Sequence, residues 1–273
     1  MISYTRQPYY LEGTHGKLFC IYFSPSEISQ HPVLIFSPFA EEMNKSRRML
    51  SQQAAQLAEM GAPVLMFDYF GTGDSEGDFA DASWEIWVSD LSIIINWLLE
   101  SNTTTFNILA MRMGALLTTR ISPSFHKFIN KVVYWQPVTS GELLMSQFYR
   151  LKLASDMLGK DSGLTLKDIK NQLQDNQHVE IAGYSLNPAL AQELSNTKLQ
   201  QIESSVLKDA YWVELINSEE KPVPPASQRV IDSLCEDGAN IHVKTVIGSQ
   251  FWSVVELVDV PQMHAITNQL LTR

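Results

Sequence analysis

Short apolar runs alternate along the chain with stretches whose apolar residues recur at helical spacing. The run Pro63–Phe67 is apolar throughout, as expected of a strand with both faces covered, whereas the apolar residues between Ser46 and Met60 share one face of a helix that Gly61 would end. The pattern predicts strands over Leu18–Phe23, Val33–Phe36, Pro63–Phe67, Phe106–Met111, Lys131–Trp135, Tyr211–Ile216 and Ile241–Ile247. It predicts helices over Ser46–Met60, Ser83–Glu100, Met113–Ile121, Pro225–Glu236 and Pro261–Leu271.

This alternation stops once, in the middle of the chain. From Val138 to about Leu207 we find no convincing strand, but several helical patterns separated by glycine and proline. A strand–helix core interrupted by one helical stretch predicts an α/β protein with a doubly wound, mainly parallel sheet. We expect residues 1–137 and 208–273 to form the core and residues 138–207 to form a helical lid.

Composition narrows the classes of partner. The 273 residues carry 30 Asp and Glu against 20 Lys and Arg, a net charge of -10, whereas nucleic acid and anionic lipid bind clustered Lys and Arg. We therefore expect no nucleic-acid partner. No apolar run approaches the roughly 18 residues that cross a bilayer, and the N-terminal residues resemble no signal peptide. We expect no integral membrane segment and a cytoplasmic location.

Cys20 and Cys235 are the two cysteines of the chain. Each lies in an apolar segment, which predicts buried free thiols in a reducing compartment. Because no Cys or His pair has the spacing of metal ligands, the sequence predicts neither a metal nor a cofactor.

The segment from Phe67 to Gly77 (FDYFGTGDSEG) follows a predicted strand. It resembles the D-x-x-G-x-G-x-S loop that follows the fourth strand of α/β-hydrolases. Asp68 can accept backbone N–H groups in such a turn, and the glycines allow positive φ. A generic glycine-rich turn is the alternative, but the length and position of the segment favour the resemblance.

The loop after the predicted strand 33–36 begins Ser37-Pro38, where α/β-hydrolases usually have His-Gly, and Glu41 and Glu42 follow. In that fold the loop supplies a backbone N–H to the oxyanion hole. Two carboxylates beside it would oppose developing negative charge. Two interpretations stay open: the pair neutralises nearby arginines, or it forms a solvated cap for the helix at Ser46.

The turn between the predicted strand 106–111 and the next helix has the sequence AMRMG. α/β-Hydrolases have G-x-S-x-G there; Gly114 matches, Ala110 replaces the first glycine, and Arg112 stands at the nucleophile position. A guanidinium stays protonated and cannot act as a nucleophile, but it clamps carboxylate or phosphate well, and a helix N-terminus also favours anions. Arg112 therefore predicts either an anionic ligand or a structural pair with Glu41, Glu42 or another buried acid.

The remaining triad positions are also irregular. Residues 218–225 (SEEKPVPP) resemble the hydrolase D-x-x-V-P stretch, so Glu219 or Glu220 would occupy the acid position. The histidine position falls within 249–252 (SQFW), which contains no histidine. His264 follows on an amphipathic helix, where a surface or core histidine is the better interpretation. A triad without nucleophile and base cannot run the usual acyl transfer.

One family combines these features: the chain resembles the second of the two hydrolase-like proteins associated with the exosortase A system of exopolysaccharide-producing bacteria. The matching blocks are residues 38–49 (PFAEEMNKSRRM), 68–75 (DYFGTGDS), 112–117 (RMGALL), 135–138 (WQPV) and 251–252 (FW). The resemblance implies the α/β-hydrolase fold and a link to exosortase and exopolysaccharide loci. It supplies no substrate, since the word hydrolase is a fold-level analogy.

Three functions follow as hypotheses. In the first, a non-catalytic or weakly catalytic homologue (a pseudoenzyme) binds a small anionic molecule under the lid, with Arg112 as anchor. The predicted ligand-binding residues are Phe39, Glu41, Glu42, Arg112, Met113, Phe251 and Trp252.

The second hypothesis is an active hydrolase of an ester, thioester or peptide with a relocated site. Its candidate nucleophiles are Ser37, Ser249 and Cys20, with His264 as a remote base. The third is a scaffold that binds a protein partner of the exosortase and exopolysaccharide system through residues 251–252 and the lid.

Overall fold

The computed structural model describes residues 1–100, 103–158, 164–218, 223–254 and 256–272. The strands are β1 (Tyr4–Glu12), β2 (Lys17–Pro25), β3 (Val33–Phe36), β4 (Val64–Phe67), β5 (Phe106–Met111), β6 (Ile129–Trp135), β7 (Val179–Ile181), β8 (Tyr184–Leu186), β9 (Ala210–Ile216) and β10 (Ile241–Ile247). The α-helices are α1 (Glu41–Glu59), α2 (Trp84–Glu100), α3 (Gly114–Leu117), α4 (Gly141–Leu158), α5 (Leu166–Gln174), α6 (Pro188–Asn196), α7 (Pro225–Glu236) and α8 (Pro261–Leu271). Short 3-10 helices are η1 (Phe79–Asp81), η2 (Thr118–Arg120), η3 (Pro123–Phe128), η4 (Leu199–Gln201) and η5 (Ser204–Val206).

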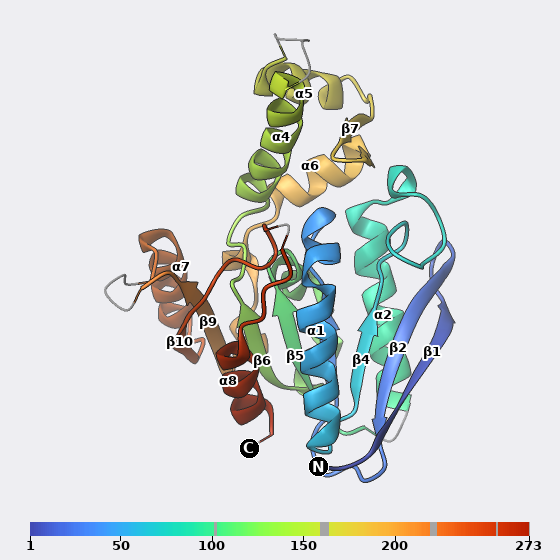
Figure 1. Ribbon diagram of the computed structural model, residues 1–273, viewed down its shortest axis with the longest axis vertical. Helices are drawn as coiled ribbons and strands as arrows, with labels where there is room; N and C mark the ends of the chain where they lie inside the picture. The colour runs from blue at the N-terminus through green and yellow to red at the C-terminus, as the bar shows by residue number, and fades with distance from the viewer. Residues whose placement is uncertain (101–102, 159–163, 219–222, 255, 273) are drawn as a thin grey trace.

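The main sheet has the strand order β1-β2-β4-β3-β5-β6-β9-β10. The β1–β2 and β2–β4 pairs are antiparallel, and the pairs from β4 to β10 are parallel. Helices α1 and α8 cover one face, and α2, α3 and α7 cover the other (Figure 1). Successive side chains of β3 point to opposite faces: Leu34 packs towards α2 and α3, and Ile35 towards α1 and α8. The predicted doubly wound, mainly parallel sheet is confirmed.

Some predicted boundaries differ from the structure. The helix predicted from Ser46 begins at Glu41, so Glu41 and Glu42 lie in its first turn, where carboxylates favour the helix dipole. Strand β1 was not predicted, because it is an edge strand with mostly exposed side chains. The helix predicted after Met113 is one short α-helix followed by a 3-10 turn. Of the two thiols predicted to be buried, Cys20 is buried but Cys235 is exposed, which corrects the second prediction.

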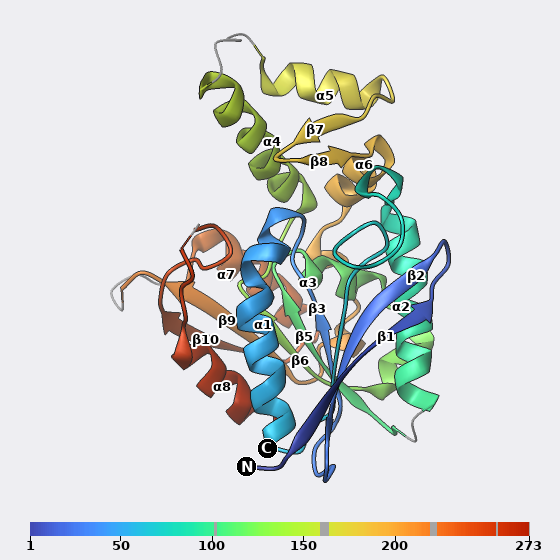
Figure 2. The same ribbon diagram turned by 45° about the vertical axis from the view of Figure 1, so that its right-hand side comes forward.

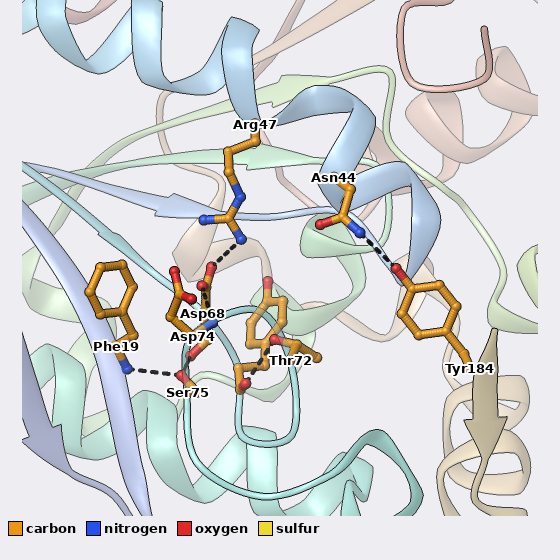
Figure 3. Close-up of polar contacts among 9 residues, drawn as sticks. Phe19, Asn44, Arg47, Asp68, Thr72, Asp74, Ser75 and Tyr184 are labelled. Carbon is orange, nitrogen blue, oxygen red and sulfur yellow. Dashed lines mark hydrogen bonds and ion pairs between the residues drawn. The ribbon is translucent and has the colours of Figure 1, made fainter. Parts of the chain in front are cut away.

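Within residues 138–207, helices α4, α5 and α6 and strands β7 and β8 lie beyond the carboxyl ends of the parallel strands (Figure 2). The expectation that they contain no strand is wrong, because β7 and β8 pair as an antiparallel hairpin. Ala182 and Gly183 connect the two strands with φ of 50° and 84°, as a two-residue hairpin turn requires. Three-residue strands are too short to show an alternating pattern in the sequence. The Tyr184 hydroxyl anchors β8 to the core by accepting a 2.9 Å hydrogen bond from Asn44 Nδ2 (Figure 3).

The glycine-rich loop after β4 is held by Asp68, as its sequence predicts. Asp68 Oδ2 accepts the Asp74 backbone N–H at 3.0 Å, and Oδ1 accepts from Arg47 Nη2 at 2.9 Å (Figure 3). The Ser75 hydroxyl donates to the Asp68 carbonyl and accepts from the Phe19 amide. This network ties the loop to both α1 and β2. It also gives Arg47 a partner other than Glu41 or Glu42.

No helix in the described ranges combines the length and apolar character that a membrane crossing requires.

We expect Gly73→Ala to lower the free energy of unfolding by roughly 2–3 kcal/mol. Gly73 has φ +56°, and an added Cβ would collide with Asp68 Oδ2. Gly183→Ala is the matched control, because Gly183 has φ +84° but nothing within 4 Å of an added Cβ. Backbone strain should lower the free energy of unfolding of this control by only about 1 kcal/mol. If urea unfolding showed the same decrease in the free energy of unfolding for both variants, the proposed role of the Asp68 loop would be contradicted.

Candidate functional site

The site forms where the direction of winding changes. Strands β3 and β5 are neighbours, yet α1 follows β3 on one face of the sheet and α3 follows β5 on the other. Adjacent loops that leave on opposite faces open a crevice at the carboxyl ends of the strands. The residues at these ends are Ala40, Arg112 and Gln136, with φ of 48°, 52° and 43°. Non-glycine residues rarely adopt this region, and such strain collects at functional sites.

Close packing at Gly114 explains why this glycine of the elbow pattern is retained. A Cβ at this position would lie 2.5 Å from the Phe36 carbonyl oxygen, so only glycine allows α3 to pack against the end of β3. Arg112 therefore occupies the tight strand-to-helix turn that its sequence position predicts.

Arg112 is paired with Glu42. Its Nε lies 3.2 Å from both carboxylate oxygens and its Nη2 lies 2.8 Å from Oε1, a bidentate contact. Both side chains are 12% exposed. Gln147 Oε1 also accepts from Nη2 at 3.4 Å, and Cζ lies 5.2 Å from the ring centroid of Trp252. Of the pairs considered for Arg112, the structure contains the one with Glu42.

A cavity of about 410 Å³ opens above this pair. Its lining residues are Phe39, Glu41, Glu42, Arg112, Gln136, Leu144, Gln147, Phe148, Leu151, Gln250, Trp252 and Ser253. Two predicted ligand-binding residues do not line it: Met113 is fully buried in the core, and Phe251 packs against Trp135 and Trp252. The walls contributed by α4 were not predicted, since nothing local in a helical pattern indicates which face will meet a distant elbow.

Glu41 is the cavity carboxyl without an ion-pair partner among the described residues. Its Oε2 is buried and accepts no hydrogen bond from the residues that the structure describes. Burial raises the pKa of Glu41 to about 6; the neighbouring Glu42 raises it further, whereas its own backbone amide, Lys45 and Arg112 lower it. This carboxyl therefore changes protonation close to neutral pH.

A third carboxyl, that of Glu214, lies behind the lining residue Gln136. It is buried in β9, where Oε2 accepts from Trp212 Nε1 at 2.6 Å and Oε1 accepts from Gln136 Nε2 at 2.9 Å. Burial raises its pKa, and both hydrogen bonds oppose that effect. The sequence did not single out Glu214, because it lies inside a predicted strand. The predicted acid positions, Glu219 and Glu220, lie outside the described residues.

No histidine is among the residues that line the cavity. His264 is buried between α8 and α1, where Nδ1 lies 2.9 Å from Gln53 Oε1 and the ring is 5.9 Å from that of Trp135. It is a core histidine, one of the two alternatives that its helical position predicted. Within the described ranges, no group of three or more His, Cys, Asp or Glu side chains could hold a metal ion.

The candidate nucleophiles of a relocated site are scattered. Ser37 is buried at the end of β3, Ser249 is exposed, and Cys20 is fully buried within β2. Burial, with the nearby Asp68 charge, raises the pKa of the Cys20 thiol to about 12, so it stays protonated and a poor nucleophile. None of the three makes a hydrogen bond to a histidine within the described residues.

The protonation of Glu41 predicts a pH-dependent effect of Glu41→Gln. The unfolded carboxyl ionises above its ordinary pKa of 4.5, but the folded one keeps its proton to about 6. The stability that this group contributes is complete below pH 4.5 and is lost as pH rises through about 6. Glu41→Gln should therefore raise the free energy of unfolding by about 1 kcal/mol near pH 7, discounted for partial exposure, and have no such effect near pH 4.5. Denaturant unfolding at both pH values, with exposed Glu142→Gln as control, measures this; a gain of equal size at both would contradict it.

No family model matches the chain, and no curated protein sequence matches it. Among solved structures, it is similar to the ferulic acid complex of Est1E from Butyrivibrio proteoclasticus (15% identity, 96% of each chain, TM-score 0.65). It is also similar to a proline iminopeptidase from Mycobacterium smegmatis (13% identity, 97% of each chain, TM-score 0.63) and to the alpha/beta hydrolase GrgF from Penicillium sp. sh18 (16% identity, 98% of each chain, TM-score 0.64). Such low identities establish the architecture alone: the chain has the α/β-hydrolase fold.

Proposed function

We propose that this α/β-hydrolase-fold protein binds a small molecule in the cavity above Arg112 and does not use a serine–histidine–acid triad. The observation that carries the proposal is the Arg112–Glu42 pair at the elbow, beside a cavity of about 410 Å³. A permanently protonated side chain held in a bidentate contact cannot attack a carbonyl group. The cavity next to it has the volume of a small-molecule site.

In this proposal residues 138–207 act as a lid over the site. Helix α4 supplies Leu144, Gln147, Phe148 and Leu151 to the cavity wall. The contact of Gln147 with Arg112 joins this helix to the elbow. Ligand recognition is therefore shared between the strand ends and α4.

The proposed link to the exosortase and exopolysaccharide system rests on the block 38–49. Three of its charged residues have ion-pair partners in the structure: Glu42 pairs with Arg112, Arg47 with Asp68, and Arg48 with Asp259. These pairs give the block a structural role in this chain; the link itself rests on the sequence resemblance alone.

The alternatives have less support. For a relocated hydrolase, the described residues do contain a Ser205–His126 contact of 2.8 Å, but neither residue lines the cavity. For a protein-binding scaffold, Phe251 and Trp252 are each 2% exposed, so their rings offer little surface to a partner.

The acidic character predicted for the ligand stays a prediction. It was based on the charge of Arg112, which Glu42 neutralises in the structure. What still favours an anion is Nη1 of Arg112, which has no hydrogen-bond partner among the described residues.

Filling the cavity should weaken ligand binding. Leu151 lines the cavity and is 37% exposed, so Leu151→Trp can place an indole in the opening without disturbing the core. Leu143→Trp is the matched control, since Leu143 is on the same helix, is 54% exposed and does not line the cavity. Metabolites that raise the Tm of the wild type should bind Leu151→Trp at least about tenfold more weakly and Leu143→Trp normally. A library without any such compound, or equal binding by Leu151→Trp, would overturn the proposed function.

A further inference from the structure

We propose that the cavity takes an organic cation, a primary ammonium group on an apolar body, and that Glu41 is its counter-ion. This inference rests on the proposed function and names the chemical class of its ligand. It departs from the anionic ligand that the arginine alone predicts.

Among the described residues, the charges that line the cavity do not cancel. Glu42 and Arg112 neutralise each other through their bidentate contact, which leaves the carboxyl of Glu41. No cation of the described residues lies within ion-pair distance of that carboxyl. An anion brought into the cavity would meet two carboxylates, and its one counter-charge is already shared. A cation would give Glu41 its first close counter-ion.

The groups that act on Glu41 come from three elements. Glu42 and Lys45 lie on its own helix, and Arg112 comes from the elbow. Tyr184 of β8 is close enough that, besides burial, the charge of Glu41 raises the pKa of its phenol. Lys45 Nζ is 3.5 Å from the Ser253 carbonyl at the rim, too far from Glu41 to pair with it. Burial raises the pKa of Tyr184, so this phenol stays neutral. In the part of the chain that the structure describes, no group near Glu41 therefore forms an ion pair with it.

The rest of the cavity suits the apolar body of such a ligand. Phe39 and Phe148 meet edge to face with centroids 5.1 Å apart, and Leu144 continues this wall. The Trp252 ring already has a cationic group 5.2 Å from its centroid. Aromatic rings attract ammonium groups through the negative charge of their faces. A carboxyl beside such walls selects a cation over a neutral molecule of equal shape.

Three probes of nearly equal shape separate the contribution of charge to the affinity from that of the apolar contacts. They are benzylammonium, benzyl alcohol and benzoate. Their affinities for the full chain can be measured near pH 7 by titration calorimetry or protein NMR. We expect benzylammonium to bind roughly tenfold more tightly than benzyl alcohol, and benzoate to bind more weakly than either. Leu151→Trp should weaken all binding that occurs in the cavity.

Glu41→Gln tests the counter-ion directly. It should lower the affinity for benzylammonium roughly tenfold and leave that for benzyl alcohol unchanged. Glu142→Gln removes an equal charge from an exposed position on α4 outside the cavity, and should change neither affinity. In the wild type, affinity for benzylammonium should rise roughly tenfold from about pH 5 to about pH 7 as Glu41 ionises, and stay flat in Glu41→Gln.

The outcomes separate this inference from the proposed function. Tighter binding of benzoate than of benzylammonium, sensitive to Leu151→Trp, would overturn the cation and leave the binding site intact. Benzylammonium binding that is absent, or that is unchanged by Glu41→Gln or by Leu151→Trp, would also overturn it. The proposed function itself fails only if no compound of any charge binds in a manner sensitive to Leu151→Trp.

Discussion

The site depends on a guanidinium and a carboxylate held face to face at the ends of two neighbouring parallel strands. Arg112 follows β5 and Glu42 lies in the first turn of α1, the helix after β3, so their contact spans the crevice that the doubly wound sheet opens. Each side chain is mostly buried, and removing one would leave the other as an uncompensated charge, which costs more than losing both. The same contact removes Arg112 from reaction chemistry and from simple anion capture.

The elbow keeps its geometry although the nucleophile is absent. Arg112 holds a positive φ, and Gly114 allows the close approach of α3 to β3. Glu41 adds a second unfavourable feature, a partly buried carboxyl with no ion-pair partner in the described ranges. Proteins retain strained or unpaired groups where function requires them and compensate elsewhere. The concentration of such groups around one cavity is the physical reason to place the function there.

The sequence predicted the core well because its signals are local. Central strands such as β3 and β4 are buried on both faces and appear as continuous apolar runs, and the Asp68 loop has turn residues at fixed spacing. The elbow was located for the same reason. An edge strand such as β1, with mostly exposed residues, lacks that signal.

The composition of the cavity could not be predicted in the same way. Leu144 and Phe148 reach the elbow through the packing of α4. Arg112 pairs with Glu42, among several possible acids, because α1 begins at Glu41 and so places Glu42 in its first turn. Glu214 looks like one polar residue in a strand until Gln136 and Trp212 are seen to bond it. The Arg112–Glu42 and Gln136–Glu214 contacts join residues 70 and 78 positions apart, so no window of sequence contains both partners.

The most direct test of the account is a double-mutant cycle on Arg112→Met and Glu42→Gln, followed by denaturant unfolding near pH 7. The account predicts a coupling free energy of at least about 1 kcal/mol, with Arg112→Met alone less stable than the double mutant because Glu42 is left unpaired. A coupling free energy near zero would show that Arg112 is not held by Glu42, and would return it to the role of a free cation in the cavity.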